Sequence, residues 1–161
     1  MTSVDLDAQV ARLRARIGQE NGPVRRRVEA GAITKFALAI GETNPLYLDE
    51  DFAAGSRFGA LIAPPTFLSR FCDPEILQDM FAFDLPLTLF LHTDDIVSYG
   101  RPIRAGDLLS VSARYADAWV KESRNGPLLF QAVDLTVEGE DGEHVATLRV
   151  KTAHFSKAQD E

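Results

Sequence analysis

The chain has 161 residues, which is enough for one ordinary domain and too little for two separate cores. Hydrophobic residues make up 45% of the sequence and charged residues 25%, a composition typical of a folded globular protein rather than a disordered one. The formal charge of −7 argues against nucleic acid as the main partner, because phosphate binding requires a basic face.

The sequence shows no sign of a membrane span or a secretory signal. Its apolar runs, such as residues 36–40, are far shorter than the roughly 18 residues that a membrane span needs. The N-terminus is acidic and lacks the basic and apolar regions of a signal peptide, so we expect a cytoplasmic protein that binds no membrane. The single cysteine, Cys72, excludes an internal disulfide, and the three histidines are too scattered to predict a metal site.

In the first half of the chain, the sequence predicts helices and one short strand. Apolar residues recur every three or four positions through the first eighteen residues, which indicates a helix that ends at Gly18. A short strand is expected over residues 24–29. The apolar density of residues 32–40 predicts a buried helix that stops at Gly41. Residues 64–71 begin with two prolines and predict a further apolar helix.

The second half of the chain predicts an antiparallel sheet. Residues 89–98 are extended in composition, and three long segments with alternating apolar residues follow, the last over residues 144–155. Short glycine-bearing links at residues 123–127 and 139–142 are typical of hairpins. Helices followed by an antiparallel meander predict an α+β domain whose sheet packs on an apolar helix.

Functional chemistry is densest in the turn over residues 41–53. This segment brings a carboxylate (Glu42), an amide (Asn44) and a phenol (Tyr47) together between two helical pieces. Loops that a rigid scaffold holds in place are common locations for catalysis. By residue type alone, however, a polar turn capped by Asn44 and Asp49 is better explained as a structural feature.

Three stretches resemble the MaoC-like proteins, a family of (R)-specific enoyl-thioester hydratases and dehydratases. The turn G-E-T-N-P-L-Y at residues 41–47 is similar to the family's G-D-x-N-P-x-H motif. Residues 57–67 end in A-P-P-T-F, and residues 91–107 contain L-H and then R-P-I-R-A-G-D, in the order that the family shows. The resemblance covers about residues 23–155 and is nearest to the FAS1-like dehydratase (MaoC N-terminal) branch.

The resemblance implies a hot-dog fold, in which an antiparallel sheet wraps around a long, mostly buried helix. We therefore expect an N-terminal helical extension over residues 1–22, a hot-dog domain over residues 23–157 and a short tail over residues 158–161. The resemblance also implies a homodimer or a heterodimer with a second hot-dog subunit, because family sites lie between two such units. Its ligand would be an acyl-CoA or acyl-carrier-protein thioester, with no other cofactor.

The chain departs from the family at both catalytic positions. Glu42 stands in place of the aspartate, and Tyr47 stands in place of the histidine. A glutamate reaches about one methylene further, a displacement that can cost about a hundredfold in rate, and a phenol is a poor base at neutral pH. Tyr47 retains the ability to donate a hydrogen bond.

Two main hypotheses follow. In the first, the chain is a hydro-lyase subunit that shapes the acyl-thioester pocket while a partner chain supplies the Asp/His pair. In the second, it is a self-sufficient hydro-lyase that uses Glu42, Asn44 and Tyr47 in a modified dyad. A thioester-binding or thioesterase-like role is a third, weaker alternative.

Further candidate site residues follow from the other two stretches. In hot-dog enzymes, backbone N–H groups at a helix N-terminus commonly polarise the thioester carbonyl. The helix that Pro65 helps to begin is the candidate here, with Thr66 and Phe67 as the N–H donors because proline has none. A simple helix start explains these residues equally well.

Three more residues match the family's third stretch. His92 would face the pocket, although a packed or edge histidine is the more common role in a strand. Arg101 and Arg104 would bind the phosphates of coenzyme A or of a phosphopantetheine arm, because arginine binds phosphate with two parallel hydrogen bonds. The alternative is that both arginines simply flank a turn.

Overall fold

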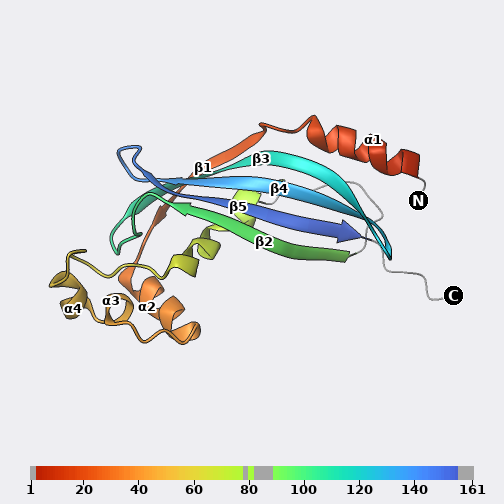
Figure 1. Ribbon diagram of the computed structural model, residues 1–161. Coiled ribbons are helices and arrows are strands. Elements are labelled where there is room, and N and C mark those ends of the chain that lie inside the picture. Colours follow the sequence, from red (N-terminus) through yellow and green to blue (C-terminus); the bar gives the residue numbers. More distant parts are fainter. Residues whose placement is uncertain (1–2, 78–79, 82–88, 156–161) are drawn as a thin grey trace.

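The computed structural model describes residues 3–77, 80–81 and 89–155, and in these residues it has an α+β architecture, as predicted (Figure 1). One antiparallel sheet has the strand order β1-β3-β4-β5-β2. The strands are β1 (Glu20–Arg27), β2 (Leu89–Tyr99), β3 (Leu108–Ser123), β4 (Gly126–Glu138) and β5 (His144–Phe155). The helices are α1 (Ser3–Arg14), α2 (Ala30–Ala39), α3 (Pro45–Leu48), α4 (Glu50–Ala54), the 3₁₀ helix η1 (Pro65–Phe71) and α5 (Pro74–Leu77). None of them is long and apolar enough to cross a bilayer.

The core lies on one face of the sheet, which we call the inner face. Alternate residues of β3, β4 and β5 are buried there, and they are cross-strand neighbours, so their side chains share this face. The core residues of this face include Val111, Tyr115, Val133, Leu135, Leu148 and Val150. Helices α2, α3 and α4 lie together near one end of the sheet, and α1 lies at the other end (Figure 1).

Helix α2 begins two residues before the predicted segment 32–40 and is less covered than expected. Its Ile33 and Ala37 are fully buried, but Leu38 is 63% exposed, so the sheet of this chain covers only one side of the helix. The helix ends at Ala39, and the chain turns away at Gly41, whose φ of 75° lies in the left-handed region that glycine tolerates best. The Glu42 N–H returns to the Ala37 carbonyl at 2.9 Å and closes the end of the helix.

Helix α1 is packed against the sheet. Leu6, Val10 and Leu13 are buried in the same core as the strands, and the Arg14 Nε donates to the Ala118 carbonyl at 2.8 Å. Strand β1 begins at Glu20, four residues before the expected strand, because it continues to pair with β3 beyond a bulge. The end of the segment that the sequence assigns to the extension is therefore part of the sheet, and the expected tail, residues 158–161, lies outside the described residues.

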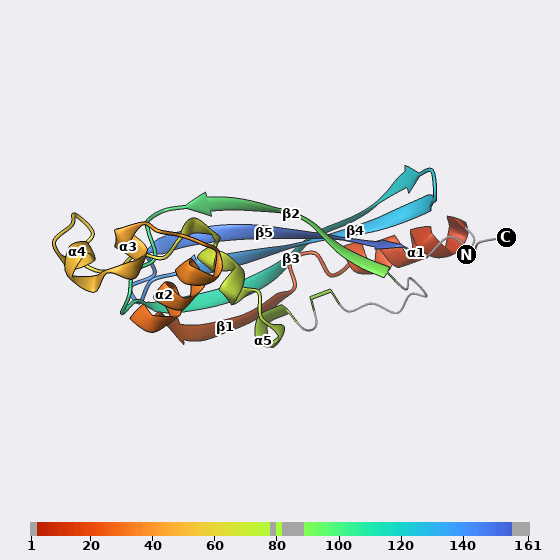
Figure 2. The same cartoon turned by 90° about the horizontal axis from the view of Figure 1, so that it is seen from below.

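Strand β2 lies at the edge of the sheet, opposite the edge that β1 forms (Figure 2). Every one of its residues is exposed, including large apolar side chains. A bulge interrupts its pairing with β5, because His92 lies opposite Thr152 while Asp94 lies opposite Lys151, which leaves Thr93 as an extra residue.

Candidate active site

The turn that follows α2 is built by two capping side chains. The Asn44 Oδ1 accepts the Leu46 N–H at 3.0 Å and caps α3, which Pro45 begins. The Asp49 Oδ1 accepts the Phe52 N–H at 2.9 Å and caps α4. The side-chain oxygen of Asn44 therefore holds the turn, which agrees with the expectation that Asn44 and Asp49 cap a structural turn.

Tyr47 lines a cavity of about 250 Å³ that lies between this turn, η1 and the end of β2. The other described residues that line it are Ile62, Ala63, Pro65, Tyr99, Gly100, Arg101 and Pro102. We call it the Tyr47 cavity. Three of the residues that the sequence predicts for the site, Tyr47, Pro65 and Arg101, therefore come together here, whereas Glu42 and Asn44 do not line the cavity.

Tyr99 is a functional candidate that sequence reasoning missed. Its hydroxyl donates to the Pro65 carbonyl, which fixes the ring in the wall of the cavity that Tyr47 also lines. Burial raises the pKa of Tyr99 above its ordinary value, so the phenol stays protonated. The sequence feature that could have identified Tyr99 is its position directly before Gly100, within the stretch of residues 91–107 that resembles the family.

Arg101 reaches the cavity but is held by carboxylates. Its guanidinium lies 2.7 Å from Asp107 Oδ2 and 2.7 Å from Glu143 Oε2, and its side chain is only 19% exposed. Burial disfavours the charged form, but the hydrogen bonds to Asp107 and Glu143 outweigh it, and the pKa of Arg101 is raised. This arrangement stabilises the turn and occupies the side chain that was expected to bind phosphate.

Arg104 differs from Arg101 in having an unused nitrogen. Its Nε is buried and has no hydrogen-bond partner among the described residues. Its backbone pairs with Ile62, a residue of the Tyr47 cavity, and its N–H donates to Asp107 Oδ2 at 2.8 Å. Buried polar atoms are almost always paired in native proteins, so Arg104 is the arginine of this stretch whose hydrogen bonding is incomplete.

The other two residues at the beginning of η1 do not line the Tyr47 cavity. Thr66 is exposed, and Phe67 is buried against Phe36 with ring centroids 5.3 Å apart. The Phe67 N–H already donates to the Pro64 carbonyl at 2.9 Å. Phe67 instead lines a neighbouring cavity of about 290 Å³, together with Arg70 and other residues.

His92 lies on the exposed edge strand and forms a pair with Asp95. The His92 Nε2 and the Asp95 Oδ1 are 2.7 Å apart. The bulge at Thr93 places these two residues, three apart in the sequence, on the same face of β2, since His92 lies opposite Thr152 and Asp95 opposite Val150. Asp95 is a second residue that sequence reasoning missed, because only the bulge brings it beside the imidazole.

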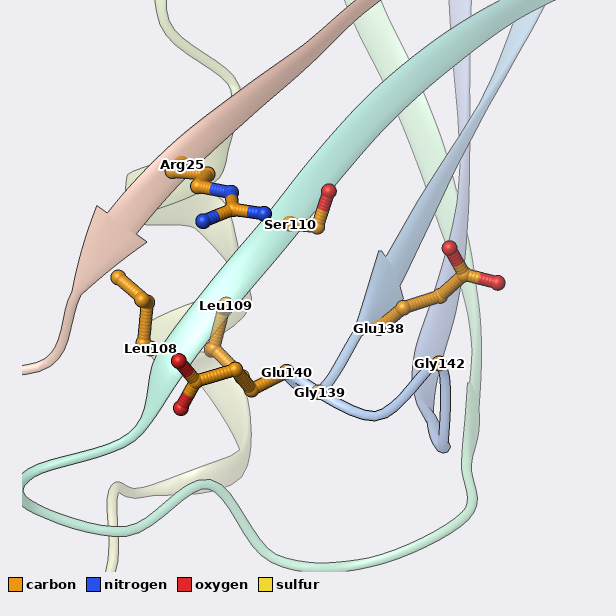
Figure 3. A pocket seen from close by; sticks show the side chains of 8 residues that line it. All are labelled: Arg25, Leu108, Leu109, Ser110, Glu138, Gly139, Glu140 and Gly142. Carbon is orange, nitrogen blue, oxygen red and sulfur yellow. The ribbon is translucent and has the colours of Figure 1, made fainter.

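Other features of the described residues offer less chemistry. Burial, followed by the charges of Asp95 and Asp73, raises the pKa of the Cys72 thiol to about 11, so it is not an activated nucleophile. A cavity of about 190 Å³ lies on the β1 side of the sheet, where Arg25 extends over β3 toward Ser110 (Figure 3). None of the predicted site residues lines this cavity. Three or more metal-ligating side chains do not gather anywhere in the described part of the chain.

Comparison with known proteins identifies the family. The model of the FAS1-like dehydratase domain region matches residues 15–148. A UPF0336 protein of Streptomyces avermitilis is 34% identical over 124 residues, which cover 74% of this chain and 78% of that protein. The chain therefore belongs to the FAS1-like dehydratase family, within the MaoC-like hydratases and dehydratases.

Solved structures agree with this family. A MaoC-like dehydratase from Rhodospirillum rubrum is 26% identical, with a TM-score of 0.60 over 89% of this chain and 94% of that one. The C-terminally truncated HadBC complex of Mycobacterium tuberculosis, a 3R-hydroxyacyl-ACP dehydratase, is 20% identical, with a TM-score of 0.69 over 85% of this chain and 96% of that one. Together with the strand order, these likenesses confirm the hot-dog fold.

Proposed function

We propose that the chain is one subunit of an (R)-specific enoyl-thioester hydratase or 3-hydroxyacyl-thioester dehydratase. In this role it shapes the pocket for the acyl thioester, and the chain that faces it across the dimer supplies the Asp/His acid–base pair. The observation that carries the proposal is the lining of the Tyr47 cavity, which contains two phenols and a paired guanidinium but no carboxylate or imidazole among the described residues.

In the proposed pocket, the phenols of the cavity act as hydrogen-bond donors toward the thioester carbonyl. The Tyr47 hydroxyl is the candidate donor to the carbonyl oxygen, and Tyr99 is held beside it by the Pro65 carbonyl. Such donors stabilise the negative charge that develops on the oxygen as water adds to the double bond or leaves. They do not move the proton, so hydration also requires a base that the cavity itself lacks.

The carrier of the acyl group would be coenzyme A or a phosphopantetheine arm. Arg104 is the better candidate for its phosphate, because Arg101 is already paired with Asp107 and Glu143. The proposal of a second hot-dog subunit is supported by the complexes among the structural relatives, of which HadBC is one. Helix α2 also has an exposed apolar side that its own sheet does not cover.

The test is the binding and turnover of crotonyl-CoA by the purified chain. We expect isothermal titration calorimetry to show binding, and we expect Tyr47→Phe to weaken it by about threefold to tenfold, the value of one hydrogen bond. Phe52→Leu, which changes an exposed side chain outside the Tyr47 cavity, should bind like the wild type. If neither crotonyl-CoA nor its hydrated product binds, the chain does not form an acyl-thioester pocket.

Turnover separates this proposal from the self-sufficient dyad. Hydration is followed by the absorbance loss of the conjugated thioester. In the assembled dimer, Glu42→Gln should leave both binding and turnover unchanged, because Glu42 does not line the cavity. Loss of turnover in a correctly folded Glu42→Gln variant would contradict the proposal and establish the modified Glu42/Tyr47 dyad instead.

A further inference from the structure

We infer that a second copy of this chain is the facing subunit, and that its His92–Asp95 pair is the acid–base pair of the Tyr47 cavity. The inference rests on the proposed function and names the partner and the residues that it requires. Each cavity of the dimer would then combine Tyr47 from one copy with His92 and Asp95 from the other.

The pair has the arrangement of an oriented base. Asp95 Oδ1 accepts a hydrogen bond from His92 Nε2 at 2.7 Å, which leaves the lone pair of the imidazole on Nδ1. The His92 side chain is 53% exposed, so the imidazole ring is accessible from outside the chain. Both side chains lie on the inner face of β2, which is also the face from which Tyr99 reaches Pro65.

Within one copy the pair is too far from the cavity. Tyr99 lines the Tyr47 cavity, and along β2 the inner-face positions between Tyr99 and His92 are those of Val97 and Asp95. At about 3.3 Å per residue, His92 lies roughly 20 Å from Tyr99 along the strand. A base must come within about 3 Å of the proton that it takes, directly or through one water, so His92 cannot serve its own cavity.

The edge of β2 is suited to pairing with another strand. It is eleven residues long and exposed along its whole length, and the exposed fractions of Phe90, Leu91 and Ile96 are 54–56%. Native edge strands are usually short, charged or covered, because an open apolar edge recruits another strand. A second β2 strand, antiparallel to the first across a two-fold axis, would cover both edges at once.

The charges on β2 exclude two registers of this pairing, and the cavity that lacks a base favours one of the others. In an antiparallel pair of strands, residues directly opposite each other share a face of the sheet. A two-fold axis between two copies of β2 therefore lies between the two copies of one residue. An axis at Asp94 or Asp95 would place two like carboxylates directly opposite each other, which is unfavourable. An axis at Ile96 instead pairs two apolar side chains and places Asp95 opposite the partner's Val97.

This register brings the acid–base pair to the partner's cavity. Counting outward from Ile96 and allowing for the extra residue at Thr93, His92 lies opposite the partner's Tyr99. Directly opposite residues have Cα atoms about 4.5–5.5 Å apart, and their side chains point to the same face. The imidazole, which lies about 20 Å from the cavity of its own chain, therefore lies at the wall of the partner's cavity.

The chemistry of the pair balances without any further reactant. In hydration, His92 Nδ1 takes one proton from water while the water oxygen bonds to C3 of the enoyl thioester. The π electrons shift toward the carbonyl, whose oxygen the partner's Tyr47 stabilises. The imidazolium then returns its proton to C2, so that one water is added and the histidine is regenerated; dehydration is the reverse.

Cross-linking tests the register. We expect Ile96→Cys, in a Cys72→Ser background, to form a disulfide-linked dimer on mild oxidation, because the two sulfur atoms would meet at the axis. Arg25→Cys in the same background lies on β1, at the other edge of the sheet, and should remain monomeric on a non-reducing gel. Equal cross-linking of the two variants, or none at Ile96, would overturn the proposed pairing.

Activity tests the shared site. His92→Asn should lower kcat for crotonyl-CoA hydration by about 10²–10⁴-fold, whereas His144→Asn, on an exposed histidine of β5, should not. Mixing and reassembling inactive His92→Asn with inactive Tyr47→Ala should restore about a quarter of the wild-type activity, because half of the dimers are mixed and each mixed dimer has one intact site.

The outcomes separate the inference from the proposed function. Failure of the mixture to regain activity, or a wild-type dimer that binds crotonyl-CoA but never turns it over, would overturn the inference and leave the proposed function with a different partner chain. A wild-type dimer that does not bind crotonyl-CoA would remove the proposed function itself.

Discussion

Four polar side chains form a buried chain of hydrogen bonds on the inner face of the sheet. The Tyr115 hydroxyl donates to Gln131 Oε1 at 2.7 Å, and Gln131 Nε2 lies 3.1 Å from His154 Nε2, which is also 3.1 Å from the Thr152 hydroxyl. All four residues are buried. Because burial disfavours the charged imidazole, the pKa of His154 is lowered to about 4.

This buried histidine predicts a loss of stability in mild acid. Between about pH 6.5 and about pH 4, the unfolded chain binds a proton at His154 that the folded chain does not, so the free energy of unfolding falls as the pH drops through this range. The contribution reaches up to about 3 kcal/mol. Urea unfolding at about pH 7 and about pH 5 measures it, and His154→Gln should show a smaller difference between the two. An equal difference in both proteins would contradict this role of the histidine.

The pairing of Arg101 predicts a structural role for this residue. Arg101→Gln should lower the free energy of unfolding by about 1–3 kcal/mol, because it leaves the partly buried Asp107 without its cation. The urea midpoint measures the loss, and Arg124→Gln, on an exposed residue in the β3–β4 turn, serves as the control. Weaker binding of crotonyl-CoA with unchanged stability would instead indicate that Arg101 contacts the ligand.

The sequence located only part of the candidate site. The family motifs identified Tyr47, Pro65 and Arg101, which meet in one cavity, because the spacing of the motifs reflects the fold that joins them. They did not identify Tyr99 or Asp95. The position of Tyr99 depends on where β2 ends above η1, and that of Asp95 depends on a bulge, and neither of these follows from residue type.

At the scale of elements, α1 is an integral part of the core. Leu13 is 4% exposed and belongs to the same buried cluster as the strands. We therefore expect Leu13→Ala to lower the free energy of unfolding by about 2–4 kcal/mol, through lost apolar burial and the cavity that remains. Arg12→Ala, on the exposed side of the same helix, should change it by less than about 0.5 kcal/mol. Similar urea midpoints for both variants would mean that α1 does not contribute to the cooperative fold.

The strands were predicted better than their ends. Strand β5 spans His144–Phe155, the range that the sequence predicted, because it pairs along its length with β4 on one side and with β2 on the other. Strand β1 begins earlier than predicted because its pairing with β3 decides where it starts. The exposed side of α2 could not be foreseen, because the apolar composition of a helix does not show which chain covers it.

At the scale of the whole molecule, the β2 edge and the centre of the sheet should respond differently to dilution. The backbone N–H groups of β2 that point away from β5 would be hydrogen-bonded in a β2–β2 dimer and open to water in a monomer. Hydrogen exchange at these positions should therefore slow as protein concentration rises, whereas exchange in the central strand β4 should not change. Ile96→Lys should remove the concentration dependence. Identical exchange in β2 at all concentrations would show that this edge stays unpaired.

The bulge at Thr93 has a consequence for the history of the gene. Because Thr93 is the extra residue, loss of its codon would restore regular alternation in β2 and leave His92 and Asp95 two positions apart on the same face, without altering any buried residue. The pair is thus compatible with two lengths of this strand, one with the bulge and one without it. Loss of one codon at this exposed edge would change the local twist of the strand while descendants of this protein keep both the core and the pair.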